Sequence, residues 1–226
     1  MIGIVVQLLL SWMLVWWYDR SNLSVLGFTL SRKRIFDFTI FLFISAILSA
    51  STFLLRLWIA KQQYQLNPEL NWTIIGEGVW YNIKSVLYEE LIFRGVLLYI
   101  LLKKLGPLKA ILISSSAFGA YHWFTHNTWG NPSGMLIDFV VTGAMGVVLA
   151  YGYVKSNSLY IPIAIHFGWN VVQQVVFSGG HLGKQLFIEV LPAPVVTISY
   201  FAYFFMQLFP LVSVLLVCYL LIRINR

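Results

Sequence analysis

The sequence Leu87-Tyr88-Glu89-Glu90-Leu91-Ile92-Phe93-Arg94 places two adjacent carboxylates and a guanidinium in a stretch that otherwise has the composition of a buried apolar helix. Ionisable side chains are costly within hydrocarbon and usually have a function there. In a helix, Glu90 and Arg94 are four residues apart, so they share a face and can form an ion pair. Glu89 lies about 100° further round the helix, so it is free to face a substrate or another polar group. A structural ion pair alone would account for Glu90 and Arg94 but not for Glu89.

The composition of the chain indicates a polytopic membrane protein. Of the 226 residues, 59% are hydrophobic and 10% are charged, whereas soluble domains have about 45–50% apolar and about 25% charged residues. The net charge of +7 does not by itself indicate nucleic acid, because Lys and Arg accumulate in the cytoplasmic loops of membrane proteins. The only cysteine, Cys218, excludes an intramolecular disulfide and a cysteine-cluster metal site. We therefore predict an all-α fold in a single integral-membrane domain over residues 1–226.

Apolar stretches separated by polar loops predict a transmembrane helical bundle of about seven spans, each needing about 20 apolar residues. The predicted spans are approximately 2–17, 36–60, 79–102, 108–124, 135–154, 159–177 and 195–222. The third would carry the whole Glu-Glu-Arg group and end at Gly106-Pro107, and the sixth would end at Ser178-Gly179-Gly180. The last contains Pro210, so it is either one tilted, kinked helix or a helix with an interfacial segment, which would make eight.

Basic residues are distributed unevenly between the two sides of this predicted bundle. Three lie on one side, namely Arg56, Lys61 and Lys184. Ten lie on the other side, namely Arg20, Arg32, Lys33, Arg34, Lys103, Lys104, Lys109, Lys155, Arg223 and Arg226. Since the basic side of a membrane protein is cytoplasmic, we expect the N-terminus outside and the C-terminus in the cytoplasm, across the plasma membrane if the chain is prokaryotic.

Three further polar residues fall inside predicted spans: His122 in the fourth, and His166 and Asn170 in the sixth. His166 and Asn170 are four residues apart, so they project from one helical face about 6 Å apart along the axis. Each histidine alone could be a hydrogen-bonded interior residue or an interfacial one. Together with a free glutamate on a third helix, however, the set is costly to keep in a membrane without use. Counted from the predicted helix starts, His122 and His166 lie at different heights, about 21 Å and about 10 Å, unless the helices tilt or start at different levels.

This set of side chains makes chemical sense in a hydrolase. Glu89 could act as general base on a water molecule, with His122 as its partner. His166 and Asn170 could donate hydrogen bonds to the oxyanion of a tetrahedral intermediate. No serine or cysteine nucleophile is required, and the motif-bearing core would span about residues 79–177.

Three short motifs occur in the order Glu89-Glu90-x-x-x-Arg94, Phe118-x-x-x-His122 and His166-x-x-x-Asn170. In order and spacing they resemble the motifs of the CPBP family, which contains the type II CAAX prenyl proteases and the bacteriocin-processing intramembrane proteases and is also called the Abi family. The resemblance covers about residues 88–171. It implies a helical membrane core of seven or eight spans and a glutamate-dependent intramembrane endopeptidase that uses neither metal nor cofactor.

The resemblance also implies a role for each motif residue. Glu89 and His122 would activate water, and His166 and Asn170 would form the oxyanion site. The remaining motif residues would have supporting roles, namely Glu90, Arg94 and Phe118. The expected partners are a membrane-tethered or transmembrane protein or peptide substrate and the lipid bilayer, with no nucleic acid. The motifs identify neither the substrate nor the oligomeric state.

Other functions are compatible with parts of this pattern. Glu89, His122 and His166 could instead hold Zn²⁺, because two histidines and a glutamate form a known catalytic zinc set. The resemblance and the lack of a His-Glu-x-x-His helix argue against this. A non-catalytic membrane scaffold, regulator or bacteriocin-immunity protein could use the same polar cluster to hold helices together. A transporter is the weakest alternative, since the sequence contains no inverted repeat.

Overall fold

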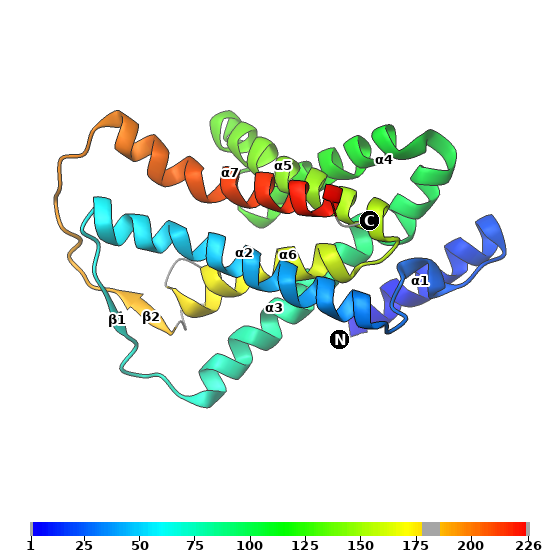
Figure 1. Ribbon diagram of the computed structural model, residues 1–226, viewed down its shortest axis with the longest axis horizontal. Helices are drawn as coiled ribbons and strands as arrows, with labels where there is room; N and C mark the ends of the chain where they lie inside the picture. The colour runs from blue at the N-terminus through cyan, green and yellow to red at the C-terminus, as the bar shows by residue number, and fades with distance from the viewer. Residues whose placement is uncertain (1, 178–185, 225–226) are drawn as a thin grey trace.

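The computed structural model describes residues 2–177 and 186–224, and its elements are almost entirely helical (Figure 1). In chain order they are α1 (Ile2–Asp19), the short 3₁₀ helix η1 (Leu23–Leu26), α2 (Arg32–Ile59), β1 (Tyr64–Leu66), α3 (Trp72–Phe93), α4 (Val96–Thr125), α5 (Pro132–Ser156), α6 (Tyr160–Val171), the π-helical turn η2 (Val172–Val176), β2 (Phe187–Glu189) and α7 (Tyr200–Ile224). The predicted end of the sixth span at residues 178–180 lies outside the described residues, as do Lys184 and Arg226.

Four of the described helices, α1, α2, α5 and α7, are long and apolar enough to cross a membrane. The protein is therefore an integral membrane protein with a helical body, as predicted. The same criterion does not select α3, α4 or α6, and α6 has only 12 residues before the chain changes to a π-helical turn. The structure thus supports the predicted membrane class, whereas seven separate spans are not shown.

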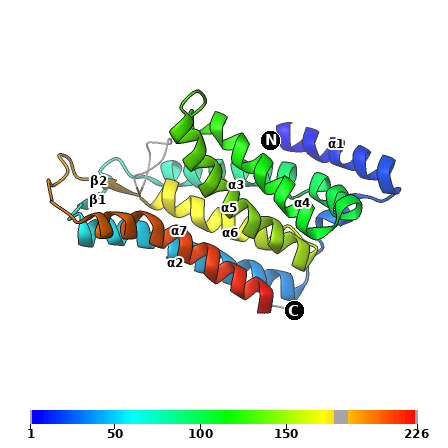
Figure 2. The same ribbon diagram turned by 90° about the horizontal axis from the view of Figure 1, so that it is seen from above.

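Helix α6 lies in the middle of the molecule, between α2 and α7 on one side and α4 and α5 on the other (Figure 2). Its close fit against α2 depends on small and polar side chains. Gly168 lies so near α2 that an added Cβ would be 2.5 Å from the Leu42 carbonyl oxygen. Ser45 and Ser49 of α2 donate hydrogen bonds to carbonyl oxygens of α6 at 2.6 and 3.1 Å. Small residues and hydroxyl groups favour such close helix packing in membranes.

The prediction of one continuous helix over residues 79–102 is wrong, because the chain breaks at Arg94 and Gly95 between α3 and α4. Gly95 has a non-helical ψ of −134°, and an added Cβ would lie 2.2 Å from the Leu91 carbonyl oxygen, so only glycine fits there without a shift. The Ser114 hydroxyl of α4 donates to the Phe93 carbonyl at 2.6 Å and so occupies a carbonyl at the end of α3. The Glu-Glu-Arg group is therefore at the end of a helix rather than inside one.

A second break occurs within α4, where Gly106 has φ 77° and ψ 171° directly before Pro107. The first segment of α4 ends beside the C-terminal end of α1, because Lys103 contacts the Asp19 carboxylate at 2.5 Å. Gly106-Pro107 thus ends a helical segment, as predicted, although that segment is separate from α3.

Two further connections show how the ends of the helices are arranged. The turn between α5 and α6 is held to the α1–α2 connection by a bond from the Ser158 hydroxyl to the Gly27 carbonyl at 2.9 Å. The last apolar stretch forms one helix, α7, with Pro210 buried inside it. This selects the single-helix alternative for residues 200–224.

Two short strands lie at the end of the molecule opposite to the turn between α5 and α6 (Figure 1). These strands were not predicted. β1 and β2 pair antiparallel, with Tyr64 opposite Glu189. The rings of Phe53 and Phe177 stack beside them, with centroids 4.2 Å apart. This small sheet closes the end of the bundle at which α2 ends and α3 begins (Figure 1).

Candidate active site

The predicted ion pair between Glu90 and Arg94 is present and fully buried. Arg94 Nη1 lies 3.0 Å from Glu90 Oε1, and both side chains have 0% exposure. The same carboxylate oxygen lies 2.7 Å from His166 Nδ1 on α6. Because a carboxylate accepts hydrogen bonds, Nδ1 of His166 is the donor in this contact. Glu90 therefore joins α3 to α6 and turns Nε2 of His166 towards Glu89.

Glu89 faces the two histidines, as the helical geometry suggested. Its Oε2 lies 4.0 Å from His122 Nε2 and 3.8 Å from His166 Nε2. The Ser85 hydroxyl donates to the other oxygen at 3.3 Å. Oε2 is buried and has no hydrogen-bond partner among the described residues. Both imidazoles thus reach the same carboxylate oxygen, which answers the question that the helix starts left open about the heights of His122 and His166.

His122 has a defined tautomer when its ring is neutral. Its Nδ1 lies 2.8 Å from the Phe118 carbonyl oxygen, which only accepts, so Nδ1 carries the proton. Nε2 then presents a lone pair towards Oε2 of Glu89. Two acceptors facing each other at 4.0 Å cannot bond directly, but one water molecule between them could donate to both.

Phe118 contacts most of the charged and imidazole groups of the site. The Arg94 guanidinium lies over the Phe118 ring, with its central carbon 3.9 Å from the ring centroid. The Phe118 ring also meets the His122 and His166 rings edge to face, with centroids 4.4 and 5.9 Å apart. A cation over an aromatic face is stabilised electrostatically, more so when desolvated. Phe118 thus helps to hold Arg94 and both histidines in place.

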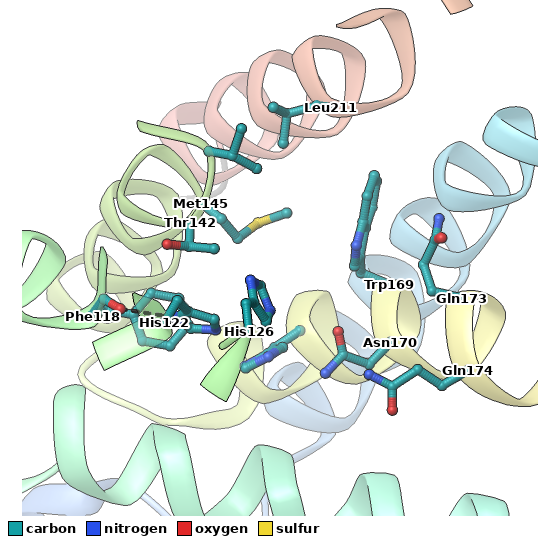
Figure 3. A pocket seen from close by; sticks show the side chains of 12 residues that line it. Phe118, His122, His126, Thr142, Met145, Trp169, Asn170, Gln173, Gln174 and Leu211 are labelled. Atoms are coloured by element: carbon teal, nitrogen blue, oxygen red, sulfur yellow. Dashed lines mark hydrogen bonds between the residues drawn. The ribbon is translucent and has the colours of Figure 1, made fainter. Parts of the chain in front are cut away.

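A cavity of about 300 Å³ opens beside the histidines, between α4, α5, α6 and α7. Asn170, one turn beyond His166, points into it together with Gln174 (Figure 3). His122 and His166 line the same cavity. The structure therefore brings Glu89, His122 and His166 together and places Asn170 on the cavity wall nearby.

The grouping of acidic and imidazole side chains bears on the zinc alternative. Across residues 2–177 and 186–224, no three His, Cys, Asp or Glu side chains are grouped as a metal site requires. Moreover, Nδ1 of His166 is already hydrogen bonded to Glu90. The geometry gives no support to Glu89, His122 and His166 as a zinc set.

Comparison with protein-family models identifies the family of part of the chain. Residues 71–172 match the family model described as type II CAAX prenyl endopeptidase Rce1-like. Residues 71–172 are an Rce1-like domain. The match covers α3 to α6 and every motif residue from Glu89 to Asn170. No curated protein and no solved structure matches the chain.

A second cavity, between the Rce1-like domain and α1, borders Glu89. It measures about 320 Å³ and is lined by α1, α3 and α4. Glu89 borders this cavity, whereas His122 and His166 border the first one. The carboxylate of Glu89 and the two imidazoles, each within 4.0 Å of that carboxylate, thus line different cavities.

Several polar side chains of the Rce1-like domain were missed by sequence reasoning. His126 lines the first cavity, and its Nδ1 lies 3.1 Å from the Asp138 carboxylate of α5. Its ring is 4.9 Å from that of His122, one turn earlier on α4. The four-residue spacing from His122 was visible in the sequence, but its pairing with Asp138 was not. Ser85, four residues before Glu89, was recognisable by the same spacing.

Proposed function

We propose that the protein is an intramembrane endopeptidase that hydrolyses a peptide bond of a membrane-associated protein or peptide. The single observation that carries the proposal is that Glu89 Oε2, buried without a hydrogen-bond partner among the described residues, lies 4.0 Å from Nε2 of His122, which lines a cavity. A water molecule between them would donate one proton to each. Membership of residues 71–172 in a prenyl endopeptidase family supports the same reaction class.

In this mechanism Glu89 removes a proton from the water, and the hydroxide adds to the carbonyl carbon of the scissile bond. His122 orients the water through Nε2. When the tetrahedral intermediate collapses, the C–N bond breaks and Glu89 returns the proton to the leaving amine. The products are a new carboxylate terminus and a new amino terminus.

The oxyanion of that intermediate would accept hydrogen bonds from His166 and Asn170. His166 uses Nδ1 to reach Glu90, so donation from Nε2 requires a proton on both ring nitrogens. Nδ1 of His166 lies 2.7 Å from Glu90 Oε1, and its Nε2 lies 3.8 Å from Glu89 Oε2.

We further propose seven membrane crossings, in which α3 and the first segment of α4 form one broken crossing. Basic residues lie beside the Gly106 bend of α4, in the last turn of α5 and in the first turn of α2, and Lys103 at the α4 bend meets Asp19 of α1. By the positive-inside rule the side that carries these residues is cytoplasmic, which leaves the N-terminus outside.

The test is the change of Glu89 to glutamine, which keeps the shape but removes the proton acceptor. Wild-type protein and Glu89→Gln, each reconstituted with a fraction of membrane proteins, would be compared for newly formed peptide termini by mass spectrometry. We expect termini that only the wild type produces, with a rate in the variant lower by about 10²–10⁴-fold. Unchanged melting in detergent would show that the variant is folded.

Equal production of termini by both proteins would contradict the mechanism. Full cellular function of Glu89→Gln would instead favour the non-catalytic alternative, in which the polar cluster only holds helices together.

A further inference from the structure

A cavity outside the Glu89–histidine group is lined by three cationic side chains. It measures about 170 Å³ and lies between the first turn of α2, the last turn of α5 and the end of α7. Lys33 and Arg34 of α2 and Lys155 of α5 border it. The rest of its lining is Ser31, Asp37, Ser156, Ile161 and Ile222. Such a cavity suits a small anionic group.

The position of this cavity relates it to the membrane surface. Its walls come from three of the four helices that are apolar enough to span a membrane, α2, α5 and α7, and it lies at one end of each. The headgroup layer of a bilayer meets a spanning helix at its end. The cationic cavity therefore lies at the depth at which lipid phosphates lie.

An apolar groove adjoins the cationic cavity and runs between α2 and α7. It also measures about 170 Å³, and the two spaces share Asp37. Its other lining is hydrocarbon or aromatic, from Phe36, Ile40, Phe41, Leu221 and Ile224. Phe36 and Ile224 are 63% and 75% exposed on the outside of the bundle. A free anion would leave this groove empty, whereas an acyl chain would fill it.

We propose that this cavity and groove bind one anionic glycerophospholipid, with its phosphate among Lys33, Arg34 and Lys155 and an acyl chain between α2 and α7. Basic cavities between transmembrane helices are suited to anionic headgroups. The bound lipid joins α2, α5 and α7 at one end, and Ile161 brings it against the first turn of α6.

The contacts of the cavity's charged groups are compatible with this ligand. Asp37 is buried and lies 3.5 Å from Lys33, so part of that cation is already balanced. Arg34 donates to the Thr29 carbonyl at 2.9 Å through one nitrogen. The Lys155 ammonium lies 5.6 Å from the ring centroid of Tyr151. Beside the Lys33–Asp37 pair, Arg34 and Lys155 add two further cations to the described lining of the cavity, which suits a phosphodiester.

The test uses the full-length protein, stripped of lipid in a neutral detergent. Its melting temperature would be measured against phosphatidylglycerol, phosphatidylcholine with the same acyl chains, and inorganic phosphate. We expect a saturable rise with phosphatidylglycerol and none with the other two at equal concentration, because only the first supplies both net negative charge and acyl chains. Equal effects of the two lipids would overturn the proposal. An equal effect of inorganic phosphate would indicate a free-anion site and would also overturn it.

Two matched charge variants and one variant in the groove locate the site. Lys155→Gln should weaken phosphatidylglycerol binding about fivefold, which corresponds to the ~1 kcal/mol of one basic residue near an anionic lipid surface. Lys109→Gln makes the same charge change at an exposed position outside the cavity and should leave binding unchanged. Ile40→Trp, which fills the groove, should also weaken lipid binding. If Lys155→Gln and Lys109→Gln behave alike, the cavity is not the binding site.

Discussion

At the scale of single residues, the charge on Glu90 is the feature on which the site depends most. One oxygen of this fully buried carboxylate contacts both Arg94 and His166, at 3.0 and 2.7 Å. Its other oxygen, and Nε and Nη2 of Arg94, have no hydrogen-bond partner among the described residues. A buried carboxylate is tolerable only when it is paired. We therefore expect the orientation of His166 to depend on Arg94 through their shared contact with Glu90.

Removal of Arg94 should destabilise the whole protein. Arg94→Ala leaves Glu90 as a buried charge without its cation and removes the group that covers the Phe118 ring. We expect a loss of about 3–5 kcal/mol in the free energy of unfolding, measured by denaturation in detergent.

Arg56→Ala is the control for Arg94→Ala. Arg56 lies 3.9 Å from Glu189, with side-chain exposures of 34% and 33%. Exposed pairs contribute only about 0–1 kcal/mol, so this loss should be much smaller. Equal stability of Arg94→Ala and the wild type would show that Arg94 is not needed to keep Glu90 buried.

The second residue-scale prediction separates oxyanion stabilisation from metal binding. Asn170→Ala should raise the activation free energy by about 2.7–4 kcal/mol, mostly through kcat, because it removes one oxyanion donor. Gln174→Ala, one turn further along the same cavity wall, is the control and should have a smaller effect. Both would be measured on a peptide substrate identified by the terminus comparison.

Treatment of the same preparation with a strong zinc chelator should leave activity unchanged, and elemental analysis should find well under one zinc per chain. Loss of activity on chelation, restored by added Zn²⁺, would reassign His122 and His166 as metal ligands.

At the scale of elements, the close approach of α6 to α2 positions both His166 and Asn170. Gly168 lies between these two residues in the sequence of α6. A Cβ added to Gly168 would lie 2.5 Å from the Leu42 carbonyl oxygen of α2. A carbonyl of the partner helix cannot move aside as the end of a flexible side chain can. The distance between α6 and α2 therefore depends on this glycine.

Gly168→Ala should separate α6 from α2 and cost about 1–3 kcal/mol of stability, as overpacking does. It should also lower activity, because His166 and Asn170 move with α6. Gly76→Ala is the control, since a Cβ there has no neighbour within 4 Å. Thermal unfolding and peptide cleavage by the two variants would be compared. If Gly168→Ala matches Gly76→Ala in both, the helix contact does not position the site.

At the scale of the whole molecule, the distribution of basic residues predicts the orientation in the membrane. In a Cys218→Ser background, single cysteines would replace Lys109 near the bend of α4 and Glu69 in the connection between β1 and α3. With intact cells, a membrane-impermeant thiol reagent should label Glu69→Cys but not Lys109→Cys. Labelling of both after lysis is the control for accessibility. The reverse pattern would place the N-terminus in the cytoplasm.

The sequence by itself determined the membrane class and the polar residues from which the site is built. Hydrophobic stretches and helical periodicity are local properties, so they indicate which segments are apolar helices and which residues share a face. The Glu90–Arg94 pair, four residues apart, was predictable for this reason. So was the separate direction of Glu89, about 100° away on the same helix.

The tertiary structure alone decided how those residues meet. Glu90 contacts His166, which is 76 positions further along the chain, and no local pattern encodes that contact. The break at Gly95 was not predicted, because the sequence around it is a continuous apolar run. The break brings the Gly95 backbone so close to the Leu91 carbonyl oxygen that an added Cβ would lie 2.2 Å from it. The paired positions of His122 and His166 at Glu89 depend on where α4 and α6 start relative to each other. Packing between helices sets these positions, and packing depends on contacts between residues distant in sequence.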